Sequence, residues 1–411
     1  MQHVELIPHL FRTEYRKIVS VLYKRFGFDQ IESAEDIASD TFATAAQAWA
    51  MNGIPTNPTA WLYNVAKNKA KNYLQRNSVF RNKVIPNISE RNSMELHEDE
   101  IDLSPQNIND SQLQMMFAIC HPTIPAEAQI GLSLRILCGF GIDEIADAFL
   151  TNKETINKRL FRAKEKIREE KIRIEFPNAS EIDARLSTVL TTIYLLFSEG
   201  YYSSSRDQVL RKEFCFEAMR LCTMLIENKY TNKPEVNALL SLMCFHASRF
   251  EARVNQNDEL ILYNEQDTNL WNTEFISKGA YFLHLATTGD NLSKYHLEAA
   301  IAYWHTKKED TKEKWENILQ LYNQLLQVEY SPIAALNRTY ALSKAKGKDV
   351  AIVEAEKLKL TDNQFFHSLL GELYINIDNR KAVTHFRTAL GLAKSAADQT
   401  NLSKKLQALE T

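Results

Sequence analysis

Residues Gly141–Glu170 restrict the fold more than any other stretch, because they predict two amphipathic helices around a polar break. In the first helix the apolar side chains recur at helical spacing: Ile142, Ile145, Ala146 and Phe149. The break at Thr151–Lys153 offers a Thr or Asn side chain that can cap the next helix. The second helix keeps its apolar side chains on one face: Ile156, Leu160, Ala163 and Ile167. Two helices joined by a tight turn form a helix-turn-helix, whose second helix can enter a DNA major groove.

The second predicted helix carries many basic and amide side chains on its outer face. These are Lys153, Asn157, Lys158, Arg159, Arg162, Lys164, Lys166 and Arg168. Arg and Lys can contact phosphates and guanine edges, and Asn can form two hydrogen bonds with adenine. The alternative is a solvated surface on an ordinary helix pair, so the rest of the chain has to decide between the two interpretations.

Composition favours a helical protein of several domains. The chain has 411 residues, 45% of them hydrophobic, a length that indicates roughly two to four folding units. Gly (11) and Pro (10) are scarce, which favours helices over a turn-rich β fold. The formal net charge is -3, but residues 151–173 carry nine Lys and Arg against four Asp and Glu. A local basic patch of this kind matters more for DNA binding than the total charge.

The cysteines and the absence of long apolar runs predict a soluble protein of a reducing compartment. The five cysteines form no CxxC pair, so we expect buried thiols and no metal site: Cys120, Cys138, Cys215, Cys222 and Cys244. The N-terminal residues lack the apolar run of a signal peptide, and no segment is long enough to span a membrane. We therefore expect a cytoplasmic protein.

Three helices are predicted in the N-terminal third, over residues 3–30, 32–51 and 59–76. The turn at 52–58 contains Gly53, Pro55 and Pro58, and is the strongest turn signal in this third. The third helix directs polar side chains to one face: Asn64, Lys67, Asn68, Lys71, Asn72 and Gln75. Such a face, with aromatic residues nearby, is typical of a helix that follows an exposed nucleic-acid strand, although a solvated bundle helix has the same pattern. Trp49 and Trp61 are better interpreted as core residues.

An acidic linker and a long helical extension complete the chain. The linker, rich in Asn, Ser, Asp and Glu, has too few apolar residues to fold alone. Near the C-terminus, Leu336 and Leu370 begin copies of a pattern that repeats after 34 residues, the tetratricopeptide period. Residues 252–267 are the exception, because their alternation permits a small β-hairpin. The predicted fold class is therefore all-α, ending in a tetratricopeptide-like solenoid.

Three parts of the chain carry a family resemblance. The sequence AEDIASDTFATAAQAW, then a Gly/Pro loop and AWLYNVAKNKAKNYL, resembles region two of an extracytoplasmic-function sigma factor of the sigma-70 family. Gly141–Glu170 resembles region four, a helix-turn-helix. The phrases LLFSEGYYSSS, SRFEARVNQNDELILYNEQD and SPIAALNR resemble the tetratricopeptide-like extension of one sigma subgroup. The implied domains are region two at 1–78, an acidic linker at 79–110, region four at 111–175 and a regulatory extension at 176–411.

The resemblance implies a factor that binds core RNA polymerase and directs promoter-specific transcription initiation. It implies contact with the β′ clamp and β flap of the polymerase, recognition of the minus-thirty-five and minus-ten promoter elements, and help in melting the DNA. Core-polymerase contacts map to Asp36, Ser39 and Asp40, with Ser39 standing where the family usually has Gln. Minus-ten contacts map to Gly53, Thr56, Asn57, Trp61, Asn64, Lys67, Asn68, Lys71 and Asn72. Minus-thirty-five contacts map to Lys153, Asn157, Lys158, Arg159, Phe161, Arg162 and Lys164, although Phe161 could also be a core residue.

Two other functions compete with the sigma factor. One is a helix-turn-helix transcription regulator that senses a peptide or protein partner through the solenoid and does not bind core polymerase. The other is a helical adaptor without a role on DNA. No paired carboxylates, nucleophile triad, phosphate loop or metal cluster is evident, so we expect neither an enzyme nor a bound cofactor.

Overall fold

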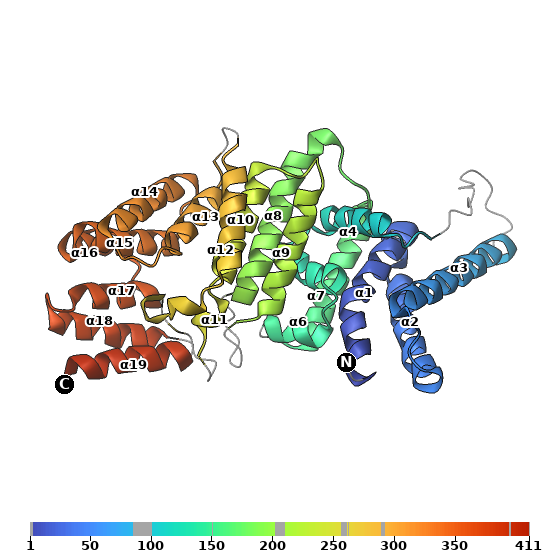
Figure 1. Ribbon diagram of the computed structural model, residues 1–411, viewed down its shortest axis with the longest axis horizontal. Coiled ribbons are helices and arrows are strands. Elements are labelled where there is room, and N and C mark those ends of the chain that lie inside the picture. Colours follow the sequence, from blue (N-terminus) through green and yellow to red (C-terminus); the bar gives the residue numbers. More distant parts are fainter. Residues whose placement is uncertain are drawn as a thin grey trace. The chain divides into compact units, whose positions relative to one another are not determined.

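A computed structural model of the protein describes residues 3–84, 101–149, 151–201, 210–255, 261, 263–288, 292–393 and 396–410 (Figure 1). Across these ranges the secondary structure is helical and contains no β-strand, which confirms the predicted all-α class. The chain divides into two compact units, Met1–Leu195 and Leu196–Thr411. Each unit is described by itself.

The first unit begins with three long helices, α1 (His3–Phe26), α2 (Ile31–Asn52) and α3 (Pro58–Val84). A 3₁₀ turn, η1 (Phe28–Gln30), joins the first two. Gly27 and Gly53 follow α1 and α2 with φ of 77° and 81°, a left-handed conformation that glycine adopts without strain. The buried faces of the three helices form one core, with Tyr15 and Leu22 from α1, Phe42 from α2 and Leu62 from α3.

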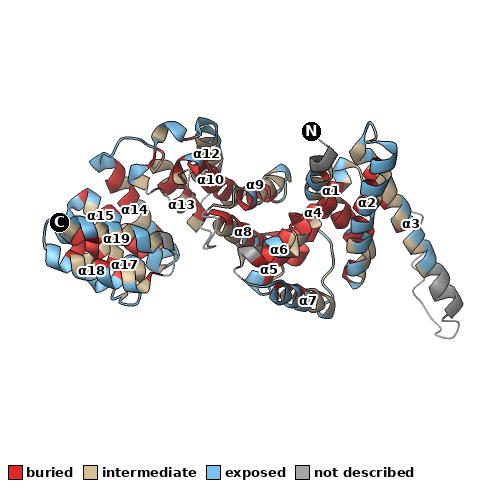
Figure 2. Cartoon of the chain, turned by 90° about the horizontal axis from the view of Figure 1, so that it is seen from below, coloured by how far each residue is buried: buried red, intermediate tan, exposed pale blue. Residues whose placement is uncertain are grey.

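The second half of this unit contains the helix-turn-helix. Its helices are α4 (Pro105–Ile119), α5 (Ala126–Leu132), a π-helical turn η2 (Ser133–Leu137), α6 (Ile142–Ala148) and α7 (Lys153–Glu169). Asn152 caps α7 as expected, because its side chain accepts a hydrogen bond from the Thr155 amide at 2.8 Å. The predicted inner face of α7 is buried: Ile156, Leu160, Ala163 and Ile167. Figure 2 shows α7 with an exposed outer face.

Helix α8 (Ala179–Tyr201) contains the boundary between the units, and five segments follow it in the second. They are α9 (Lys212–Glu227), α10 (Pro234–Ala247), α11 (Phe250–Arg253), α12 (Thr273–Ala286) and α13 (Lys294–Trp304). Helices α10 and α12 cross so closely that a Cβ on Gly279 would lie 2.6 Å from the Phe245 ring. Ser241 fastens this crossing by donating to the Gly279 carbonyl at 2.7 Å.

The described part of residues 252–267, where a small hairpin is predicted, contains no β-strand. Val254 makes a single bridge, and two 3₁₀ turns follow, η3 (Tyr263–Glu265) and η4 (Thr268–Leu270). Residues 256–258 of the predicted turn lie outside the described residues. The Ile261 amide donates to the Arg253 carbonyl at 2.8 Å, and Tyr263 packs beside Trp271 with ring centroids 6.2 Å apart.

The C-terminal helices form the expected helix pairs. They are α14 (Lys312–Val328), α15 (Pro332–Lys346), α16 (Lys348–Lys357), α17 (Gln364–Tyr374), α18 (Asn379–Leu392) and α19 (Ala396–Glu410). Leu336 on α15 and Leu370 on α17 are both buried, at equivalent positions of successive pairs. Gly371 lets α17 approach α18, since a Cβ there would lie 2.7 Å from the Phe386 ring. The repeat is inexact, because Tyr374 is buried whereas Tyr340 is exposed.

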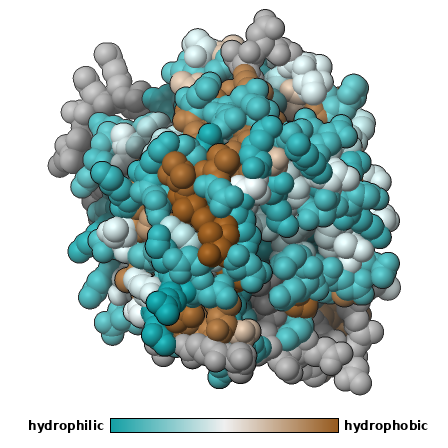
Figure 3. Space-filling view, turned by 90° about the vertical axis from the view of Figure 1, so that its left-hand side faces the viewer, coloured by the Kyte–Doolittle hydropathy of each residue, from teal (hydrophilic) through white to brown (hydrophobic). Residues whose placement is uncertain are grey.

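The surface of this second unit includes exposed apolar side chains. Figure 3 shows apolar side chains gathered in a stripe on one face of the molecule. The large apolar residues exposed in the C-terminal helices include Val350, Val353 and Phe365. Among the described residues, no helix is long and apolar enough to cross a membrane. All five cysteines are free and buried, and burial raises the pKa of Cys120 to about 11 and that of Cys244 to about 12.

Candidate nucleic-acid interface

Helix α2 presents the residues predicted to bind the polymerase on one exposed face. Asp36, Ser39 and Asp40 are three and four positions apart, so they lie side by side on the helix, and all three are exposed. The opposite face, with Ile37 and Ala38, is buried in the core. This face of α2 can therefore offer two carboxylates to a basic partner without disturbing the fold.

The turn before α3 has a structural role in addition to its predicted contacts. Gly53 and Thr56 are exposed, whereas the Asn57 side chain accepts a hydrogen bond from the Ala60 amide at 3.0 Å and so caps α3. Trp61 is half-buried against Trp49, with ring centroids 5.4 Å apart. Asn57 and Trp61 thus hold the start of α3 in place. The exposed polar side chains further along the helix form its main polar surface.

The outward stripe of α3 is polar along three helical turns. Its members are exposed except for Lys67, which is half-buried: Asn64, Lys67, Asn68, Lys71 and Asn72. Beside the stripe, the Tyr63 hydroxyl donates to a Glu14 oxygen at 2.6 Å, which orients the aromatic ring. An open pocket of about 330 Å³ lies here, lined by Ala60, Tyr63, Asn64, Lys67, Ile101, Asp102 and Leu103. Three residues that precede α4 thus lie against the helix predicted to hold a DNA strand.

The outer face of α7 divides into exposed and engaged side chains. Asn157, Lys158 and Arg162 are exposed, and Phe161 is 59% exposed, so it is not a core residue. The Arg159 guanidinium lies 2.9 Å from Glu127 and packs over the ring of Phe149. Lys153 forms an exposed ion pair with Asp143 at 2.6 Å. The middle of this outer face is therefore exposed, and the charged side chains at its edges, Lys153 and Arg159, form ion pairs.

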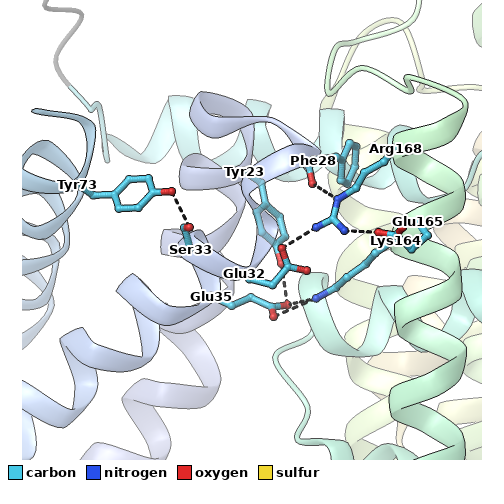
Figure 4. Close-up of polar contacts among 9 residues, drawn as sticks. All are labelled: Tyr23, Phe28, Glu32, Ser33, Glu35, Tyr73, Lys164, Glu165 and Arg168. Carbon is cyan, nitrogen blue, oxygen red and sulfur yellow. Dashed lines mark hydrogen bonds and ion pairs between the residues drawn. The ribbon is translucent and has the colours of Figure 1, made fainter. Parts of the chain in front are cut away.

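Two basic residues near the end of α7 are bound to acidic residues of α2 (Figure 4). The Lys164 ammonium lies 3.0 Å from both oxygens of Glu35, and Tyr23 donates to the same carboxylate at 2.7 Å. Only 11% of the Lys164 side chain is exposed, so this predicted phosphate contact is already engaged inside the protein. We call Glu32, Glu35, Lys164 and Arg168 the α2–α7 contact.

Arg168 completes the α2–α7 contact through three groups. Its guanidinium lies 2.6 Å from Glu32, donates to the Phe28 carbonyl at 3.0 Å, and also pairs with Glu165 (Figure 4). Partial burial opposes ionisation of Glu32, but a backbone hydrogen bond and Arg168 together hold the pKa of that carboxyl below its ordinary value. The sequence showed both charged faces but gave no sign of their pairing, because the partners are well over a hundred residues apart.

Among the residues that the structure describes, no three His, Cys, Asp or Glu side chains are placed to hold a metal ion. The candidate interface consists of two outward polar helix faces, one on α3 and one on α7, together with the acidic face of α2.

Comparison with known proteins agrees with this arrangement. Residues 10–79 match the family described as sigma-70 region 2, and residues 185–287 match a family of unknown function, DUF6596. The chain is 30% identical to an uncharacterised protein of Rhizobium meliloti, over 93% of this chain and 91% of that protein. It is also 30% identical, over 26% of this chain and 58% of the relative, to an ECF RNA polymerase sigma-E factor of Haemophilus influenzae. No solved structure matches.

The chain belongs to the sigma-70 family, as a factor of the extracytoplasmic-function type with a DUF6596 extension. It also belongs to one family with the uncharacterised Rhizobium meliloti protein, which it matches over nearly its whole length. Its role is in transcription initiation, and its family partners are core RNA polymerase and promoter DNA. The region-two match, over residues 10–79, includes α2 and most of α3.

Proposed function

We propose that this sigma factor recognises the minus-thirty-five element with α7 and holds the melted minus-ten strand on the 53–58 turn and α3. In this proposal the exposed face of α2, with Asp36, Ser39 and Asp40, binds the β′ clamp, and region four reaches the β flap. Residues 1–78 act as region two, 79–110 as the linker, 111–175 as region four and 176–411 as the extension.

The observation that carries the proposal is the orientation of α7. Asn157, Lys158 and Arg162 project outward, while the other side of the helix is fixed in the core by Ile156 and Leu160. A rigid helix with an exposed Asn, Lys and Arg on one face suits the major groove, where these side chains can bond base edges and phosphates.

The polar stripe of α3 supports the minus-ten assignment. Asn64, Asn68 and Asn72 alternate with Lys67 and Lys71, so amides that can bond base edges lie beside cations that can bind phosphates. Turning a base out of the duplex costs a few kcal/mol, which contacts to the released strand would have to offset.

The α2–α7 contact supports a further part of the proposal, that this arrangement is a closed state. The two promoter elements are separated by about 25 base pairs, or roughly 85 Å along B-DNA. Lys164 and Glu35 are within hydrogen-bonding distance, so α7 lies directly against region two. Region four must therefore leave region two before both elements can be bound together.

In vitro transcription over a promoter library, with core polymerase and the full chain, tests the promoter assignment. We expect a defined promoter class to be transcribed, and Arg162→Ala to lower transcription from it roughly tenfold or more, because a lost base contact costs about 1–3 kcal/mol. Glu169→Gln, which changes a charge at the far end of the same helix, is the control. Equal activity of Arg162→Ala and the wild type would contradict the assignment.

Core binding is tested separately. Asp36→Ala with Asp40→Ala is expected to weaken binding to core polymerase, measured by gel filtration or anisotropy, because both carboxylates face solvent and support no core packing. The control is Asp143→Ala, an exposed carboxylate beside α7. Unchanged polymerase binding by the α2 variant would show that another surface makes the contact.

A further inference from the structure

The short segment Ile101–Leu103, which we call the strap, lies against the stripe of α3. Ile101 is only 8% exposed, and the three strap residues form one side of the pocket whose other side is Ala60, Tyr63, Asn64 and Lys67. Asn64 and Lys67 are among the residues assigned above to the minus-ten strand. The strap and a bound strand would therefore use the same surface.

The first turn of α4 holds the strap in place. The Asp102 carboxylate accepts hydrogen bonds from the Ser104 amide at 2.8 Å and the Ser104 hydroxyl at 2.9 Å, and Ser104 is the N-cap of α4. The Asp102 carbonyl accepts from the Asn107 side chain at 2.6 Å. Asn107 in turn accepts from Lys24 of α1 at 3.1 Å. The position of the strap thus depends on α4 remaining on α1.

The charge of the strap resembles that of a nucleic-acid backbone. Hydrogen bonds from Ser104 hold the pKa of Asp102 below its ordinary value, and the nearby Lys67 and Lys24 lower it further. Asp102 is therefore ionised at neutral pH, and it places a negative charge near the same lysine that a DNA phosphate would approach. Ile101 meanwhile covers apolar surface beside the oriented ring of Tyr63.

We propose that the strap competes with unpaired DNA for α3 and is withdrawn when region four leaves region two. Because α4 both carries the strap and packs on α1, the movement that frees α7 also uncovers α3. Access to the minus-ten strand is then coupled to release of the minus-thirty-five helix. This inference rests on the proposed function of α3, and it adds a means of keeping the free factor from binding single strands.

Binding of a fluorescein-labelled single-stranded oligonucleotide of mixed sequence to the full chain, measured by anisotropy, tests the proposal. The double variant Ile101→Ala and Asp102→Asn is expected to bind about fivefold or more tightly than the wild type, because a larger fraction of molecules has α3 uncovered. Asn107→Ala, which removes the anchor without changing any pocket residue, is expected to act in the same direction. If the double variant does not fold, Asn107→Ala still tests the proposal.

Two control variants separate the possible failures. Asp110→Asn removes an equal charge from α4, where the Asp110 carboxylate accepts hydrogen bonds from Gln106, and is expected to alter binding much less. If the double variant binds no better than the wild type while Lys67→Ala weakens both, the strap proposal is wrong and the α3 assignment stands. If Lys67→Ala has no effect in any background, both the α3 assignment and the strap proposal are wrong.

Discussion

At the scale of single residues, two neighbours on α7 have opposite environments. Leu160 is buried and its side chain packs against Gly131 of α5, whereas the Phe161 ring is mostly exposed. A large aromatic side chain exposed beside Asn157, Lys158 and Arg162 contributes little to the fold. It is instead available to a ligand, since aromatic residues can make apolar contact with a thymine methyl group in the major groove.

We therefore expect Phe161→Ala to affect mainly transcription and Leu160→Ala to affect mainly the stability of the fold. Phe161→Ala should change the free energy of unfolding by no more than about 0.5 kcal/mol but reduce promoter-dependent transcription. Leu160→Ala should lower the free energy of unfolding by about 2–5 kcal/mol, because it leaves a cavity in the core. Urea unfolding and in vitro transcription measure the two effects. A large loss of stability in Phe161→Ala would contradict the surface assignment.

At the scale of elements, the α2–α7 contact is one of the polar links between the two halves of the first unit. Lys164 and Glu35 are both mostly shielded from water, so their attraction is screened less than that of a surface pair. In the Arg168–Glu32 pair the Glu32 side chain is exposed to solvent. A surface ion pair of that kind contributes only about 0–1 kcal/mol to the free energy of unfolding. The Lys164–Glu35 pair is therefore the stronger part of the contact.

Neutralising this contact should open the first unit. With fluorophores at Met51→Cys on α2 and Thr155→Cys on α7, both exposed positions, we expect Glu32→Gln with Glu35→Gln to lower energy transfer between them. The physical reason is that Lys164 and Arg168 lose their ionic partners on α2. The control is Glu127→Gln, which breaks the Arg159 pair inside region four and leaves the α2–α7 contact intact. Identical transfer in all three proteins would show that contacts other than these ion pairs keep the unit closed.

Elements and their inner faces could be predicted from the sequence, but contacts between elements could not. The spacing of Ile156, Leu160, Ala163 and Ile167 fixes which side of α7 is buried, because helical periodicity is a local property. The pairing of Lys164 with Glu35 depends on how distant helices pack, and no local pattern carries that information. The strap was missed for the same reason, and a short alternation such as that of residues 252–267 does not specify two full strands.

At the scale of the whole molecule, the second unit contains a buried group of cations and histidines. His246 and His305 are half-buried near the buried Arg249, which contacts His246 at 3.4 Å and lies over the Tyr263 ring. Burial, with Arg249 and Lys314 adding to it, lowers the pKa of His305 to about 3. Burial, then Arg249 and Arg253, hold the pKa of His246 well below its ordinary value. The fold thus favours the neutral form of both imidazoles.

Acid should therefore destabilise the second unit. Since the pKa of His305 is lower in the folded than in the unfolded state, its stabilising contribution is complete above pH 6.5 and is lost as pH falls from there towards about 3. Each such histidine adds a loss of up to about 1.4 kcal/mol per pH unit. We expect urea unfolding of His305→Asn to show a shallower fall between pH 6.5 and 5 than the wild type. Equal slopes would contradict a buried neutral His305.

The α2–α7 contact also bears on how salt affects this factor. Binding of a basic protein to DNA weakens with salt in proportion to the number of phosphates it neutralises, because condensed ions are released. In the opening that we propose, two internal ion pairs break first, and salt helps that step. The logarithmic slope of promoter affinity against salt concentration would then undercount the phosphates contacted. Replacing Glu32 and Glu35 by Gln would steepen the slope, because these ion pairs would no longer have to break. The slope of the wild-type protein therefore reports the opening of the protein as well as its binding to the promoter.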